Sequence, residues 1–359
     1  MPTVSLDSPT MSWKARPEVN AVWQLRREDY TLSGEQQELR DSFRALFEKS
    51  VGADRVRAAE PLGFDAALWQ ETGPQLVSMA LSESAGGDGA GLVDLALVVE
   101  EAGRAAAPVP TVEAIAGARA LERMGVTGEL FDIVKAAKTI VTISPAIAKA
   151  DRRLVPAGAV AEAVVAVRGD DVVVKTGPTA ALVPNLGCAP MGWWDVTGGT
   201  IIGSRSDFDG IAVEWQILNA AALVGLGQAA VDIGVRYAKE RTAFGSPIGA
   251  FQAIAHPLVD AAAAVEGARR LMWRAAWFAD NEPDALGVLG VGALVSAASA
   301  AEKAGAVAIH TQGGFGVTLE SDAQLYYRRA KSWALTAADR RVLLHDAADA
   351  VLGPTEGPR

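Results

Sequence analysis

Three successive blocks of hydrophobic periodicity constrain the fold of this chain most strongly. Apolar residues recur at helical spacing from Ser33, which can cap a helix together with Gln36, to about residue 125. Apolar and β-branched runs around a turn at Asp170-Asp171 follow over residues 126–212, and helical periodicity returns from Glu214 to about residue 352. Helices and strands that occur in blocks, without alternation, favour a mainly α, α+β fold over a doubly wound sheet.

The same pattern predicts four segments. We expect a flexible N-terminal tail over residues 1–30, a helical domain over 31–125, a small β domain over 126–212 and a C-terminal helical bundle over 213–354. Within the first domain, helices are expected at residues 65–76, 92–105 and 112–123, and within the second, strands at 139–143, 161–167 and 172–175.

Composition excludes several classes of function. The formal charge of −10, with no basic stripe, argues against nucleic acid as a partner. A single cysteine, Cys188, excludes an intrachain disulfide, and His256, His310 and His345 lack metal-ligand spacing, so no metal is expected. The N-terminus has no secretory signal, and the apolar segment 217–233 is interrupted by polar residues. We therefore expect a cytoplasmic protein that does not enter a membrane.

Two glycine-containing motifs could bind a phosphate group. The first, Arg241-Thr-Ala-Phe-Gly-Ser-Pro, offers a guanidinium beside an aromatic ring, and the second, His310-Thr-Gln-Gly-Gly-Phe-Gly, offers backbone amides that a ligand can approach closely. A helix C-terminal arginine followed by a glycine stop explains either motif without a ligand. A third motif, Gly225-Leu-Gly, has dinucleotide-binding spacing but lies inside a helical run, which indicates close helix packing instead.

Together these segments carry a family resemblance. The stretch from Tyr237 to Ile254, and Gly313-Gly-Phe-Gly followed by Tyr326-Tyr-Arg-Arg-Ala-Lys, resemble two signatures of acyl-CoA dehydrogenases, and residues 83–101 are similar to the family as well. The resemblance implies an N-terminal helical domain, a β-barrel-like middle domain, a C-terminal four-helix bundle and a tetramer that binds FAD. Residues that it assigns to the flavin nucleotide of a neighbouring subunit are Arg241, Phe244, Gln252, Gly313 and Gly314, with His310 standing where the family commonly has glutamine.

The departures from the family pattern concern the reacting centre. The family reaction needs a carboxylate base, but the two family positions for that base fall on Trp215 and Ala337 here. Glu214 is one residue away, a step that turns a helical side chain by about 100°, and it remains a weak candidate. The stretch from Thr142 to Lys149 also replaces the motif that holds the flavin ring in the family.

Three hypotheses follow from the resemblance and its departures. The first is a base-less subunit of a heteromeric α2β2 acyl-CoA dehydrogenase, similar to those of actinobacterial steroid side-chain degradation. It pairs with a homologous catalytic chain, acts on an acyl-CoA and passes electrons to an electron-transfer flavoprotein. The second is a self-sufficient homotetramer with an atypical base such as Glu214. The third is a non-enzymatic relic that binds acyl-CoA or a protein partner.

Overall fold

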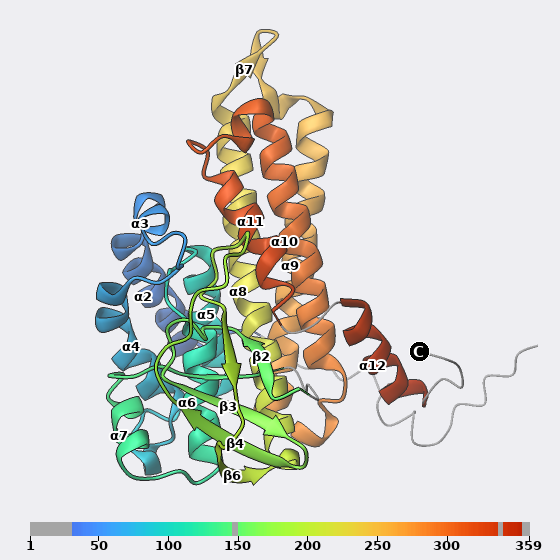
Figure 1. Cartoon of the computed structure of the whole chain (residues 1–359). Helices are drawn as coiled ribbons and strands as arrows, with labels where there is room; N and C mark the ends of the chain where they lie inside the picture. The colour runs from blue at the N-terminus through green and yellow to red at the C-terminus, as the bar shows by residue number, and fades with distance from the viewer. Residues whose placement is uncertain (1–30, 146–149, 337–339, 354–359) are drawn as a thin grey trace, which may run out of the picture. The chain divides into compact units, whose positions relative to one another are not determined.

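The structure, a computed structural model, describes residues 31–145, 150–336 and 340–353. The tail expected over residues 1–30 lies outside this part of the chain. From Leu32 onward the chain forms one unit, in which helices precede and follow a region of strands (Figure 1). This mainly helical arrangement confirms the predicted fold class.

The N-terminal helices begin at polar residues that were visible in the sequence. Ser33 and Gln36 exchange two hydrogen bonds of 3.1 Å at the start of the first helix, and the Asp65 carboxylate accepts one of 2.9 Å from the amide of Leu68. Two short helices, α3 and α7, were not predicted. The helices of this part are α2 (Gly34–Ser50), α3 (Ala53–Ala58), α4 (Ala66–Ala80), α5 (Leu92–Arg104), α6 (Thr111–Arg123) and α7 (Glu129–Lys135).

The strands form an open sheet and a separate two-stranded ribbon. The sheet has the order β1-β3-β4-β6, with β1 parallel to β3 and the other pairs antiparallel, and β2 pairs with β5 in the ribbon. All four sheet strands overlap runs that the sequence predicts, including one at Thr200-Ile-Ile that falls on β6, whereas the ribbon was missed. The strands are β1 (Val141–Ile143), β2 (Arg152–Val155), β3 (Ala163–Arg168), β4 (Asp171–Thr176), β5 (Gly192–Asp195) and β6 (Thr200–Ser204).

The long helix α8 begins earlier than the sequence pattern suggested. Its first residue is Arg205, not Glu214, because the Ser204 amide and hydroxyl both donate to the Asp207 carboxylate and so start the helix directly after β6. The elements after it are β7 (Thr242–Ala243), β8 (Ser246–Pro247), α9 (Gln252–Asn281), α10 (Leu289–Gln312), α11 (Ala323–Trp333) and α12 (Arg340–Leu352). Helices α8 to α11 contact one another as a bundle.

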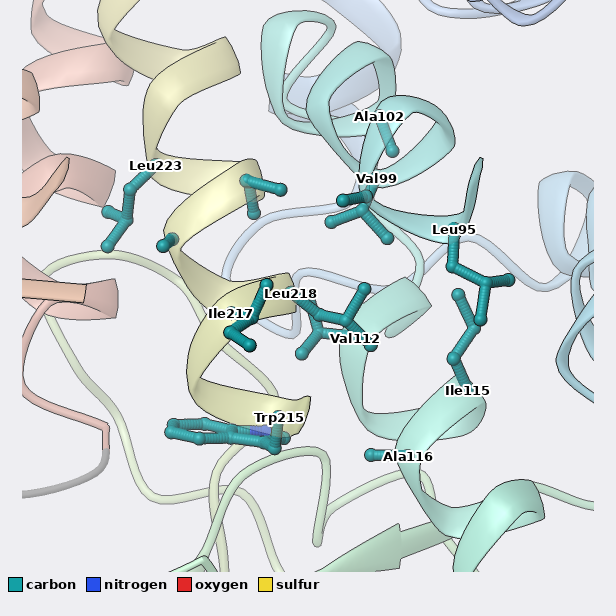
Figure 2. Packing of buried hydrophobic residues seen from close by; sticks show 14 of the residues in the cluster. Leu95, Val99, Ala102, Val112, Ile115, Ala116, Trp215, Ile217, Leu218 and Leu223 are labelled. Atoms are coloured by element: carbon teal, nitrogen blue, oxygen red, sulfur yellow. The ribbon is translucent and has the colours of Figure 1, made fainter. Parts of the chain in front are cut away.

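Helix α8 (Arg205–Glu240) is the core of this unit. Figure 2 shows its side chains meeting those of α5 and α6. A side chain at Gly225 would overlap the α5 backbone at Glu100, so the glycine spacing serves helix packing, as predicted. Within the described residues, α8 alone is long and apolar enough to cross a membrane, and 83% of its most apolar window is buried inside the protein. Such burial is typical of a core helix.

Candidate functional site

A cavity of about 80 Å³ lies beside α8, where α5, the start of α6 and the end of α11 come together with the strand region. Asn219 of α8 and Thr336, just after α11, both line it, and the Asn219 Nδ2 donates to the Thr336 hydroxyl at 3.1 Å. Asn219 is one helical turn beyond Trp215, and Thr336 immediately precedes Ala337. The cavity therefore lies about one helical turn from Trp215, one of the two positions at which a base was expected.

Neither position supplies a proton acceptor. Trp215 is fully buried among apolar side chains (Figure 2), and its indole nitrogen has no hydrogen-bond partner in the described part of the chain. Ala337 lies outside the described residues, and an alanine side chain accepts no proton. The volume that a carboxylate would need on α8 is occupied by the indole ring.

Glu214, the weak candidate for a base, is engaged in ion pairs. Its carboxylate accepts from Nε of Arg119 at 2.7 Å and from Nη2 of Arg123, both on α6. Burial of Glu214 favours the neutral acid, but the charges and hydrogen bonds of the two arginines outweigh it and lower the pKa of the carboxyl. Glu214 does not line the cavity. A carboxylate held in this way is a poor base and joins α6 to α8 instead.

A different carboxyl, which the sequence analysis missed, lies at the cavity. Glu113, in the first turn of α6, lines it and is only partly exposed. Burial raises the pKa of Glu113 to about 7. Its sequence context, a glutamate near a helix start, is ordinary and gives no sign of the cavity.

The Arg241 motif forms an exposed hairpin at the opposite end of α8 (Figure 1). Arg241 ends the helix and its side chain is exposed, and Phe244 and Gly245 form the two-residue turn with φ angles of 53° and 82°. Positive φ at both positions is characteristic of the tight turns that suit hairpins. The turn leaves Phe244 96% exposed, with its ring nearly perpendicular to that of Phe251, and Gln252 follows at the exposed start of α9.

The glycine motif lies beside this hairpin. His310 is exposed in the last turn of α10, and Gly313, with φ 63° and ψ −139°, takes a conformation nearly restricted to glycine. No atom lies within 4 Å of where a Cβ would be at Gly313 or Gly314, so space is open beside both. The ring of Phe315 stacks on Tyr237 of α8 at 6.3 Å, which brings the two predicted motifs together.

The cavity and the exposed motifs are far apart. Arg241 follows Asn219 by 22 residues, so about 33 Å of continuous helix separates them, at 1.5 Å per residue. The ribityl arm between a flavin ring and its first phosphate spans only about 9 Å when extended, at roughly 1.3 Å per bond. One FAD cannot place its ring in this cavity and its diphosphate at Arg241 of the same chain.

Comparison with known proteins identifies the family. The acyl-CoA dehydrogenase N-terminal domain matches residues 33–127, and the acyl-CoA dehydrogenase C-terminal domain matches residues 215–351. The chain belongs to the acyl-CoA dehydrogenase family. Acyl-CoA dehydrogenase IpdE2 of Mycolicibacterium smegmatis is 32% identical over 304 residues, which cover 83% of this chain and 93% of the relative.

Solved structures share the acyl-CoA dehydrogenase fold. A chain of the ChsE4-ChsE5 complex from Mycobacterium tuberculosis superposes with a TM-score of 0.83 at 22% identity, covering 92% of this chain and 100% of that one. A Tcur3481-Tcur3483 steroid ACAD variant gives a TM-score of 0.80 at 24% identity, covering 90% and 99% of the two chains.

Acyl-CoA dehydrogenases are FAD-dependent oxidoreductases, and the two regions of this chain fit that cofactor differently. The exposed guanidinium of Arg241 and the open space at Gly313 and Gly314 fit a diphosphate. The 80 Å³ cavity is too small for a three-ring flavin. The Thr142 hydroxyl, at the start of the altered ring-binding stretch, is buried and donates to the Pro156 carbonyl at 2.8 Å, while residues 146–149 of that stretch lie outside the described part.

Proposed function

We propose that this chain is a cytoplasmic, base-less subunit of a heteromeric acyl-CoA dehydrogenase, paired with a homologous catalytic chain in an α2β2 assembly. It contributes Arg241, Phe244, Gln252, His310 and the Gly313-Gly314 backbone to the nucleotide of an FAD whose ring lies in the partner. The complex oxidises an acyl-CoA to the α,β-unsaturated thioester, and the partner provides the base.

The observation that carries this proposal is Trp215. A buried indole occupies the position of the base on α8, and the neighbouring Glu214 is neutralised by two arginines. The distance of about 33 Å along α8 supports a role for the exposed arginine motif at a cofactor seated in another chain. A chain that retains only the residues for binding the cofactor of a neighbouring subunit is suited to a heteromeric enzyme.

We also propose a substrate class, a partner and an electron acceptor for the complex. One structural neighbour is described as a steroid ACAD and another as a complex of two named chains. These descriptions support a bulky, steroid-linked acyl-CoA as the substrate class and a second acyl-CoA dehydrogenase chain as the partner. The acceptor that we propose is an electron-transfer flavoprotein.

Purification of this chain alone, and together with a co-expressed acyl-CoA dehydrogenase chain from the same organism, tests the proposal. Flavin absorbance and native mass are measured for both preparations. We expect no bound flavin for the chain alone, and a tetramer with one FAD per pair of chains for the complex. Full flavin occupancy in a homotetramer would contradict the proposal in favour of a self-sufficient enzyme, and a complex without flavin would favour a non-enzymatic relic.

A further inference from the structure

Cys188, the only cysteine of the chain, lies in the wall of the cavity on a loop that is braced by hydrogen bonds. Its φ of 49° is left-handed, which is uncommon for a residue other than glycine. The Asn185 side chain spans the loop: its Nδ2 donates to the Ala189 carbonyl at 2.7 Å, and its Oδ1 accepts from the Ala189 amide at 3.0 Å. These bonds hold the backbone that carries the thiol.

Two guanidinium groups near this thiol share one carboxylate. Arg328 donates from Nη1 to the Cys188 sulfur at 3.5 Å, and from Nη2 to the Glu60 carboxylate at 2.7 Å. Arg329, which lines the cavity and interacts electrostatically with Cys188, donates to the same Glu60 oxygen at 3.1 Å. The three charged groups leave one positive charge in excess. A neighbouring arginine favours the thiolate, which is the nucleophilic form of cysteine.

A buried hydroxyl at the same cavity has no partner. Thr111 lines the cavity and is 5% exposed, and its Oγ1 forms no hydrogen bond within the described residues. Such a group is costly unless a ligand or water completes it. Asn219 and Glu113 also line the space. The cavity therefore combines a nucleophile with polar groups that suit a small ligand able both to donate and to accept hydrogen bonds.

The size of the cavity restricts which reagents can reach the sulfur through it. A cavity of about 150 Å³ in another protein holds benzene. A volume of about 80 Å³ then holds roughly three or four heavy atoms by the same proportion. Hydrogen peroxide, with its two oxygen atoms, fits this space, whereas a thiol such as glutathione does not. Because the chain has no second cysteine, no disulfide within it can consume an oxidised Cys188.

We propose that Cys188 is a site of oxidation by hydrogen peroxide, and that the sulfenic acid formed there persists in the cavity. The thiolate sulfur attacks one peroxide oxygen, so that an S–O bond forms as the O–O bond breaks. The sulfur loses two electrons and the peroxide gains them. The other oxygen leaves as hydroxide and takes up the proton that the thiol released, which gives one molecule of water. Arg328 stabilises the thiolate, and the Thr111 hydroxyl donates to a peroxide oxygen.

Mass spectrometry of the peptide that contains Cys188 tests this assignment. The full-length protein, as it is isolated, is treated at neutral pH with hydrogen peroxide or with the larger reagent N-ethylmaleimide, either folded or unfolded in urea. Catalase then removes the peroxide, and dimedone, added with denaturant, traps any sulfenic acid. Cys188→Ser serves as the blank. We expect a dimedone adduct from the folded protein, and a ratio of oxidation rate to maleimide rate about tenfold higher in the folded than in the unfolded protein.

Two results of this experiment would overturn the proposal. The first is a folded protein that gives no dimedone adduct, which would mean that peroxide does not oxidise the thiol in the cavity to a persistent sulfenic acid. The second is a ratio of oxidation rate to maleimide rate that unfolding leaves unchanged, which would mean that the cavity selects nothing. Neither measurement requires flavin or a partner chain, so this proposal and the proposed function can fail separately.

Variants distinguish a built site from a cysteine that peroxide merely reaches. Arg328→Gln should slow oxidation about tenfold, and Arg328→Lys should retain most of the rate because it keeps the charge. Thr111→Val should slow oxidation about fivefold. Thr72→Val is the matched control, since the Thr72 hydroxyl is also buried but donates to the Leu68 carbonyl and does not line the cavity. If Arg328→Gln does not fold, the two threonine variants decide, and equal oxidation rates for them would contradict the proposal.

Discussion

The two ends of α8 (Arg205–Glu240) differ in whether the residues at the family's functional positions are buried or exposed. Near its start, the helix buries Trp215 in the core and commits Glu214 to ion pairs with α6. At its end, Arg241 and the hairpin turn at Phe244 remain exposed, next to the glycine motif. The buried end stabilises this chain, whereas we propose that the exposed end binds another molecule. One helix can therefore lack the catalytic base of the family and still present an exposed arginine motif.

Replacement of the buried indole should have the largest effect. Trp215→Ala removes a fully buried ring and leaves a void, so we expect the free energy of unfolding to fall by about 3–5 kcal/mol. Urea denaturation of the purified protein measures this change. The half-exposed Trp193 is the matched control, and its replacement by alanine should cost less than about 1 kcal/mol. A smaller loss of unfolding free energy than this for Trp215→Ala would contradict the structural role of this end of the helix.

Loss of one arginine from Glu214 should have a smaller effect at the same end. Arg119→Leu leaves a buried carboxylate with Arg123 as its remaining partner, and we expect destabilisation of about 3 kcal/mol by urea denaturation. The exposed Arg205→Leu should change stability by less than about 0.5 kcal/mol. Adding Glu214→Leu to Arg119→Leu should recover part of the loss, because the uncompensated charge is removed. Additive losses in the double variant would mean that the ion pair is not the cause.

The Glu113 carboxyl predicts a dependence of stability on pH. Its folded-state pKa of about 7 lies above the ordinary value of 4.5, so the folded chain keeps a proton that the unfolded chain releases. Stability is therefore lost as pH rises from 4.5 to 7 and levels off above. Glu113→Gln abolishes this loss, so its unfolding free energy should exceed that of the wild type by about 3 kcal/mol at pH 8 and by little near pH 4.5. A pH-independent difference in denaturation midpoints would contradict this expectation.

At the exposed end of α8, a substitution should lower FAD affinity and leave the free energy of unfolding nearly unchanged. Arg241→Ala should weaken FAD binding by the assembled complex about tenfold, or about 1.4 kcal/mol, because one charge-assisted contact to phosphate is lost. Its unfolding free energy should stay within about 0.5 kcal/mol of the wild type, since the side chain is exposed. Fluorescence titration with FAD and urea denaturation measure the two quantities. Arg241→Lys keeps the charge and should lie between the two proteins in FAD affinity.

The exposed end of α8 could be predicted from the sequence more completely than the buried end. Motifs such as Arg241–Gly245 and Gly313-Gly314 combine chemistry and turn geometry within a few residues, so their placement at helix ends could be read directly. The capped starts of α2 and α4 were predictable for the same local reason. The early start of α8 at Arg205 was missed because the weak apolar pattern before Glu214 hid the Ser204 cap.

Properties that depend on distant segments could not be predicted. The partners of Glu214 come from α6, about ninety residues earlier in the chain. The cavity that Glu113 lines is likewise closed in part by residues of α8 and the end of α11, far away in the chain. No local pattern encodes such contacts, so the sequence identified where a base was missing but not which carboxyl lies in the cavity.

An experimental structure of the co-purified complex with FAD tests the central claim most directly. The account predicts the flavin ring in the partner chain, with the FAD diphosphate next to Arg241 and the Gly313-Gly314 backbone of this chain. It also predicts that Trp215 remains buried as it is here. A flavin ring seated beside Asn219 and Thr336 of this chain, with the indole displaced, would contradict the account.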